Sequence, residues 1–131
     1  MTSDLSYVAY SVLLTWVMLM TGSLVRARGW TPHGFVVALG NRDDLPAPSP
    51  LAGRADRAAR NMLENLVLFV ALLFAARLGG VDGAKLAPAA GVFFWARVVY
   101  FPVYLAGIRV LRTVVWGVSL VGLAMILRAM M

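Results

Sequence analysis

The sequence contains no cysteine and only one histidine, His33. The absence of cysteine excludes disulfides, cysteine nucleophiles and thiolate metal sites. A single histidine cannot build a metal site from several histidines, and a Ser-His-Asp triad is not expected either. The side chains that carry function in this chain must therefore be of other types.

Charged residues are also scarce. They make up 14% of the 131 residues, whereas 61% are hydrophobic. Soluble domains contain about 25% charged residues, and a soluble domain this small could not bury so much apolar surface. The composition therefore predicts an integral membrane protein. Four spans of about 20 residues leave about 50 residues for loops, so we expect a single membrane domain over residues 1–131.

The apolar stretches predict an all-α bundle of four transmembrane helices. The N-terminal stretch has no positive residues before it, so we expect a retained span there rather than a signal peptide. Residues 27–55 are rich in glycine and proline and predict a loop. In this loop the apolar piece 35–39 is expected on the membrane surface or under the loop, and residues 41–44 form a polar turn. The predicted spans are residues 5–26, 56–78, 85–108 and 112–129.

Cations are distributed unevenly along the chain. There are twelve Lys and Arg residues against six Asp and Glu, and eleven of the cations are Arg. A basic chain is also typical of nucleic-acid-binding proteins, but cations that flank apolar spans commonly mark the cytoplasmic side. Eight cations belong to one side and three to the other. We therefore expect loops 27–55 and 109–112 in the cytoplasm and both termini outside.

One polar stripe lies inside the second predicted span. Arg57, Arg60, Asn61 and Glu64 are spaced i, i+3, i+4, i+7, which places them on one helix face. Arg60 and Glu64 are expected to pair, and Arg54 extends the face by one turn. A buried ion pair that fixes helix packing is one interpretation. The surplus positive charge favours another, because an uncompensated buried charge needs an anion, namely a ligand.

A second stripe lies in the third predicted span. Arg97, Tyr100 and Tyr104 are spaced i, i+3, i+7. Arg97 interrupts an apolar run and needs a partner, for which Glu64 is a candidate. The two tyrosines are either anchors at the membrane boundary or hydroxyls that line a polar cleft.

More arginines lie at the predicted cytoplasmic mouth. Arg109 and Arg112 precede Thr113, and Arg26 and Arg28 end the first span. They are either simple topology signals or part of a binding site. Because a guanidinium group binds carboxylates bidentately, their convergence predicts a small cytosolic polyanion that is reached from the membrane edge.

The segment Arg54–Asn65, R-A-D-R-A-A-R-N-M-L-E-N, resembles the R-x-x-R-A-x-R-N-x-x-E signature of the MAPEG family. These are the membrane-associated proteins in eicosanoid and glutathione metabolism. They include microsomal glutathione transferases, leukotriene C4 synthase and the microsomal prostaglandin E synthase. The resemblance covers essentially the whole chain through its length, four spans, long first loop and the segment Ala96-Arg97-Val98 with Tyr104. The turn at residues 41–44 resembles bacterial members in particular.

The resemblance implies a homotrimer of four-helix bundles in a bacterial inner membrane. Glutathione, as cosubstrate, would lie between neighbouring subunits near the cytoplasmic side. Arg112 would stabilise the glutathione thiolate and Thr113 would assist, because a nearby cation lowers a thiol pKa. The residues expected to hold glutathione are Arg26, Arg57, Arg60, Asn61, Glu64, Arg97, Tyr100 and Tyr104.

The expected function is that of a glutathione S-transferase or peroxidase that acts on a hydrophobic substrate dissolved in the bilayer. The alternative is a non-catalytic scaffold, or a lipid- or anion-binding protein, with the same fold. A small transporter is disfavoured, because the chain lacks broken helices in paired repeats. The expected partners are membrane lipid, a hydrophobic small molecule and further copies of the chain. Neither nucleic acid nor a metal ion is expected.

Overall fold

The structure is a computed structural model that describes residues 1–43 and 45–131. Asp44 and hence part of the polar turn expected at residues 41–44 lie outside the described residues. All regular structure within the described ranges is helical. The helices are α1 (Ser3–Ala27), α2 (Pro32–Leu39), α3 (Pro50–Leu78), α4 (Gly83–Ala106) and α5 (Arg109–Met130).

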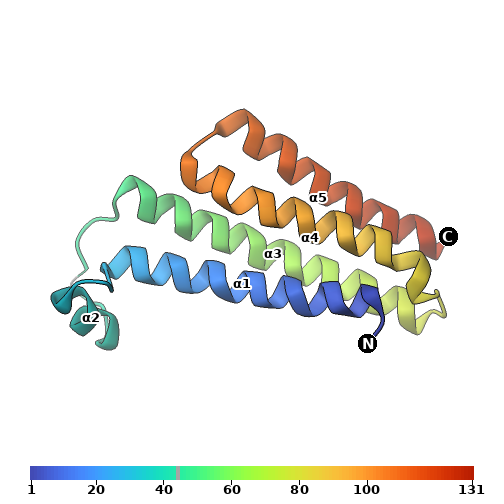
Figure 1. Cartoon of the computed structure of the whole chain (residues 1–131), viewed down its shortest axis with the longest axis horizontal. Coiled ribbons are helices and arrows are strands. Elements are labelled where there is room, and N and C mark those ends of the chain that lie inside the picture. The colour runs from blue at the N-terminus through green and yellow to red at the C-terminus, as the bar shows by residue number, and fades with distance from the viewer. Residues whose placement is uncertain (44) are drawn as a thin grey trace.

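Four of these helices, α1, α3, α4 and α5, are long and apolar enough to cross a membrane. They run side by side with alternating direction, so that both termini lie at one end of the bundle (Figure 1). The short helix α2 lies at the other end, beside the end of α1, and includes the apolar piece expected at residues 35–39. The predicted all-α bundle is confirmed, and four of its helices have the length and apolar character predicted for membrane spans.

Local sequence signals fix the starts of the two helices that carry most of the predicted site. The Ser49 hydroxyl accepts a hydrogen bond from the backbone N–H of Ala52 at 3.1 Å, and Pro50 occupies the first position of α3. In the same way, the Asp82 side chain accepts a hydrogen bond from the backbone N–H of Ala84 at 3.0 Å at the start of α4. Helix α3 therefore contains the whole segment from residue 54 to residue 65.

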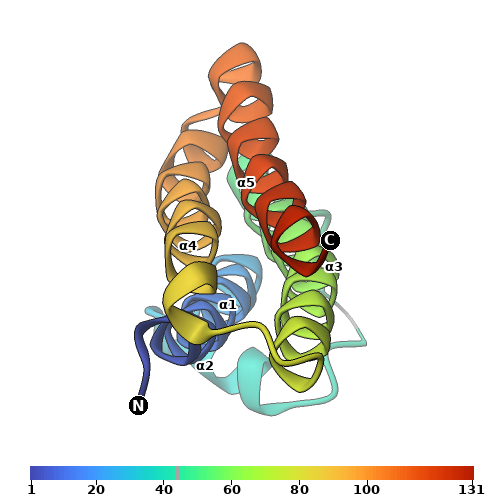
Figure 2. The same ribbon diagram turned by 90° about the vertical axis from the view of Figure 1, so that its right-hand side faces the viewer.

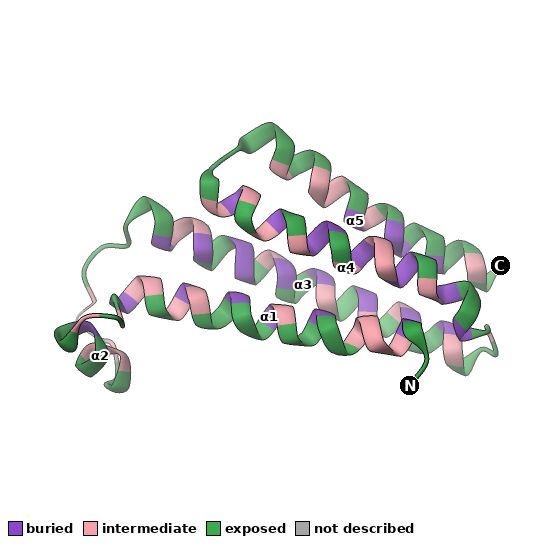
Figure 3. Cartoon of the chain, viewed as in Figure 1, coloured by how far each residue is buried: buried purple, intermediate pink, exposed green. Residues whose placement is uncertain are grey.

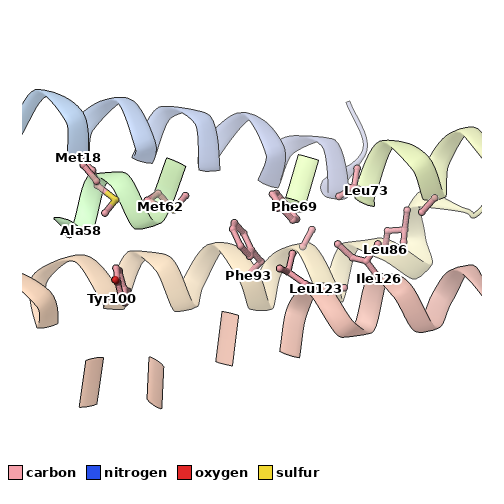
Figure 4. Close-up of a cluster of buried hydrophobic side chains, with 14 of the residues drawn as sticks. Met18, Ala58, Met62, Phe69, Leu73, Leu86, Phe93, Tyr100, Leu123 and Ile126 are labelled. Atoms are coloured by element: carbon pink, nitrogen blue, oxygen red, sulfur yellow. The ribbon is translucent and has the colours of Figure 1, made fainter. Parts of the chain in front are cut away.

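The core lies between the pair α1–α3 and the pair α4–α5 (Figures 2 and 4). Phe69 of α3 stacks on Phe93 of α4 with their ring centroids 4.2 Å apart. Met18 and Met62 fill the same core nearer to the α2 end. At Gly122 of α5, an added Cβ atom would lie only 2.9 Å from the backbone N of Phe93. Close helix packing at this point therefore requires a residue without a side chain.

Outward faces of the long helices are apolar. Figure 3 shows buried positions facing the bundle interior and exposed positions on the outside. Large side chains on the outside include those of Leu13, Trp16, Val67 and Val118. An exposed apolar surface of this extent is expected where the surrounding solvent is lipid.

Candidate functional site

The alternating helix directions gather most of the arginines at one end of the bundle. This end, which we call the arginine end, holds the last turn of α1, the first turns of α3 and α5, and the last turn of α4. Several cavities open there, and most of the predicted site residues line two of them. These two cavities share no lining residue, and α3 lies between them.

The first, which we call the arginine cavity, has a volume of about 470 Å³ and lies between α1, α3 and the segment before α3. Its charged lining residues are Arg26, Arg42, Asp56, Arg57 and Arg60, which is four cations to one carboxylate. Nε of Arg60 lies 3.0 Å from Oδ2 of Asp56, but the two side chains are 75% and 58% exposed, so this ion pair is weak. The cavity therefore keeps a surplus of positive charge.

The second, the aromatic cavity, has a volume of about 220 Å³ and lies between α3, α4 and α5. The guanidinium of Arg112 lies 4.6 Å from the ring centroid of Tyr104, which places the cation at the cavity by a cation–π contact. The rings of Tyr100 and Tyr104 meet edge to face, 5.4 Å apart. The lining residues are Asn61, Tyr100, Tyr104, Arg112, Thr113 and Trp116.

Arg97 is fully buried beneath the aromatic cavity. Its Nη1 donates a hydrogen bond to Oδ1 of Asn61 at 2.8 Å, and its guanidinium lies 4.6 Å from the ring centroid of Tyr100. The interpretation of these two tyrosines as cleft-lining residues thus agrees with their positions, since both are buried and line the cavity.

Both expected partners of Glu64 were wrong. Arg60 pairs with Asp56, one turn earlier on α3, and Arg97 contacts Asn61 instead. Glu64 itself is exposed and lines neither cavity. The reason is the rotation of α3, which turns Asn61 toward α4 and leaves the carboxylate one turn further on facing outward.

The predicted single stripe on α3 is divided between the two cavities. Arg57 and Arg60 line the arginine cavity, whereas Asn61 lines the aromatic cavity. One chain therefore does not bring together all the residues predicted to hold one ligand. Arg26 belongs to the arginine cavity, and Thr113, whose hydroxyl donates to the backbone oxygen of Arg109 at 3.1 Å, belongs to the aromatic cavity.

Arg54 has a structural contact instead of a place in either cavity. Its Nε donates to the backbone oxygen of Leu105 at 2.9 Å, where α4 ends. A cation at a helix C-terminus satisfies a carbonyl that has no partner within the helix. Gly107 follows with a φ of 76°, a left-handed conformation that glycine adopts without strain. Arg54 therefore joins the first turn of α3 to the end of α4.

Three charged or aromatic lining residues of the two cavities were not predicted from the sequence. Trp116 lies one turn after Arg112 on α5, and Asp56 lies one turn before Arg60 on α3, so helical spacing was a usable signal for both. Arg42 lines the arginine cavity from the loop, where no periodicity indicates the direction of a side chain.

The fold and the exposed apolar surface define the class of protein: an all-α integral membrane protein with four spanning helices. A sequence model of the MAPEG family matches residues 5–131, and the chain belongs to this family. The family match covers α3, α4 and α5, all but the first two residues of α1, and every lining residue of the two cavities. A comparison with curated proteins gives no match.

Proposed function

We propose that this protein binds glutathione at the arginine end and uses its thiol either to conjugate a hydrophobic electrophile in the bilayer or to reduce a hydrophobic hydroperoxide there. The observation that carries the proposal is the surplus of arginine around two open cavities, with Asp56 the one carboxylate among their described lining residues. Glutathione has two carboxylates, which arginine binds bidentately. Membership of the MAPEG family supports a glutathione-related function.

In the proposed reaction, Arg112 stabilises the glutathione thiolate. A cation beside a thiol favours its deprotonated, nucleophilic form. With an aryl halide, the sulfur forms a C–S bond, the halide leaves with the bonding electrons, and the thiol proton passes to solvent. With a hydroperoxide, two glutathione molecules become one disulfide while the hydroperoxide is reduced to an alcohol and water.

A homotrimer would complete this site. The two cavities lie on different sides of α3 within one chain, so a ligand that touches both needs the arginine cavity of one subunit and the aromatic cavity of its neighbour. A trimer would also enclose Glu64, which is exposed in the single chain. Native mass spectrometry in detergent is expected to give trimers, and a monomer as the only species would contradict the shared site.

The test of function uses the purified protein in detergent. Isothermal calorimetry is expected to show glutathione binding. The protein is also expected to catalyse conjugation of glutathione to a chromogenic aryl halide, and the bound glutathione should show the ultraviolet absorbance of a thiolate. A glutathione analogue with serine in place of cysteine serves as a control, since it should bind without reacting. A folded protein that gives neither heat nor turnover would refute the proposal.

We also propose that the arginine end faces the cytoplasm of a bacterial inner membrane, with both termini outside. Eight cations flank this end and three flank the other. Because the chain has no cysteine, a single cysteine introduced at Ser3 or at Asn41 reports its own side. An impermeant thiol reagent on intact cells should label the first variant only, and the reverse labelling would invert the topology.

A second candidate function is non-catalytic binding of an anionic lipid headgroup. The Arg60 side chain lines the arginine cavity and is 75% exposed, so a lipid headgroup outside the bundle could reach it, which favours this second function. Binding of vesicles with phosphatidylglycerol headgroups that glutathione does not compete away, without turnover, would support this function over the first.

A further inference from the structure

Arg97 is a buried cation that contacts only neutral groups among the described residues. The side chain is 0% exposed, near the middle of α4. Its Nη1 donates to Oδ1 of Asn61 at 2.8 Å, and its Nη2 lies 3.5 Å from the backbone oxygen of the same residue. The guanidinium also lies over the rings of Tyr100 and Phe93. Both of its hydrogen-bonding contacts therefore converge on one residue, Asn61.

These contacts determine which way the Asn61 amide faces. Arginine has donors and no acceptor, so the group that meets it must be the amide oxygen. Nδ2 of Asn65 lies 3.4 Å from the same oxygen, and this is again a donor. With its oxygen held between two donors, the Asn61 amide turns its NH₂ group elsewhere. Asn61 lines the aromatic cavity.

We propose that Arg97 is a positioning residue that holds the Asn61 NH₂ group as a hydrogen-bond donor toward the ligand in the aromatic cavity. The inference rests on the proposed function and adds to it the direction of the hydrogen bond. The ligand atom that meets Asn61 is an acceptor, such as a glutathione carboxylate or the thiolate sulfur.

Trp116 gives independent support from another helix. It lines the same cavity from α5, and its Nε1 is buried without a partner among the described residues. A buried N–H without an acceptor is unfavourable. An acceptor atom of a ligand would satisfy it. The cavity also contains Arg112, and none of its described lining residues is a carboxylate. Every one of these features calls for an acceptor.

Asparagine is the residue type that this role requires. An aspartate at position 61 would neutralise Arg97 and form a stronger pair with it. It would, however, present only acceptors to the cavity. The chain instead keeps the Arg97 cation without a carboxylate partner among the described residues and keeps a donor at the cavity wall.

The experiment is a double-mutant cycle on glutathione affinity, measured by calorimetry in detergent. Arg97→Met in the wild-type background is expected to weaken binding about tenfold, because the amide can then rotate. In an Asn61→Ala background the same change should cost less than about twofold, because no amide remains to be positioned. Arg97→Lys should retain most of the affinity, since lysine is also a donor that must face an oxygen.

Two further variants keep the test decisive if Arg97→Met does not fold. Asn61→Asp should form the bundle, with an unfolding temperature at least that of the wild type, and still lose about tenfold or more in affinity. Trp116→Phe, which keeps an aromatic ring and loses only the N–H, should lose about fivefold.

The outcomes separate the two levels of proposal. If the wild type binds glutathione and Arg97→Met weakens the affinity equally in the wild-type and Asn61→Ala backgrounds, Arg97 has only a structural role and the inference is overturned. If Asn61→Asp binds as well as the wild type, Asn61 is not a donor to the ligand. If the folded wild type gives no heat with glutathione, the proposed function fails, and the inference fails with it.

Discussion

The two ends of the bundle differ in whether their charged side chains are paired within the chain. At the end that holds the termini, Asp4 of α1 is 0% exposed, and its Oδ2 lies 3.3 Å from Nε of Arg77 on α3. Gly83, at the start of α4, packs so closely that an added Cβ atom would lie 2.7 Å from Oδ1 of Asp4. At the arginine end, four cations share one cavity with a single carboxylate.

We interpret the paired charge as structural and the unpaired arginines as the proposed binding site. The Asp4–Arg77 pair joins two helices and faces a third, and its charges cancel within the chain. The arginines of the other end leave a net charge beside open space, which an external anion can neutralise. We therefore expect substitutions at the two ends to separate cleanly: ligand affinity and turnover should change at one end, and stability at the other.

The largest effect is expected at Arg112. Arg112→Met should lower the rate of glutathione conjugation about 100-fold, because a cation positioned at a developing or stabilised anion contributes on that scale. The rate is followed with an aryl halide at saturating glutathione. Arg109→Met is the matched control, since Arg109 does not line the aromatic cavity. An equal loss of conjugation rate in both variants would show that Arg112 has no specific role in stabilising the thiolate.

A smaller effect is expected at Arg57, which lines the arginine cavity without an ion-pair partner among the described residues. Arg57→Gln should weaken glutathione binding by about 2 kcal/mol, roughly 30-fold, the scale of a hydrogen bond to a charged group. Calorimetry measures the change. Arg128→Gln removes the same charge at the opposite end and should leave the affinity unchanged. A similar loss there would mean that only overall charge attracts the ligand.

At the opposite end, Asp4→Asn should destabilise the bundle by about 2 kcal/mol, because Arg77 loses its counter-charge while the side chain at position 4 stays buried. Glutathione affinity should not change. Thermal unfolding in detergent gives the stability, and Asp43→Asn, at an exposed loop position, is the control. Loss of binding without loss of stability would contradict the separation of the two ends.

The smallest effect is expected at the close contact between α4 and α5, which lies between the two ends of the bundle. Gly122→Ala should destabilise the bundle by about 1 kcal/mol, because the new methyl group meets the α4 backbone at Phe93. Gly117→Ala lies on the same helix, with open space within 4 Å, and should be neutral or slightly stabilising. If both variants unfold at the same temperature, the close contact between α4 and α5 does not require glycine at position 122.

Much of the fold was predictable because hydropathy is a property of consecutive residues. The four spans follow from apolar stretches that only lipid can surround. The start of α3 was placed too late, since the helix begins at Pro50 after the Ser49 cap and not at residue 56, so the end of the predicted loop 27–55 is helical. The region of the site was predictable for the same reason, since ionisable residues inside an apolar run need an explanation wherever they occur.

The pairings were not predictable, because they depend on how each helix is rotated. Glu64 looked like the partner of both Arg60 and Arg97, yet Asp56 and Asn61 contact them. Helical spacing allows Arg60 to pair in either direction along α3, and it says nothing about which residue meets α4. The Asp4–Arg77 pair spans most of the chain and leaves no local signal at all.

Composition and local pattern were thus sufficient for the solvent, the number of spanning helices and the end at which cations gather. These depend on short-range properties, the free energy of placing each stretch in lipid and the hydrogen bonds of each helix. Packing across the bundle settled the rest: which arginines are paired, which face a cavity, and which way the Asn61 amide turns. Contacts between helices far apart in the chain fix these rotations, and Gly122 against Phe93 is one such contact.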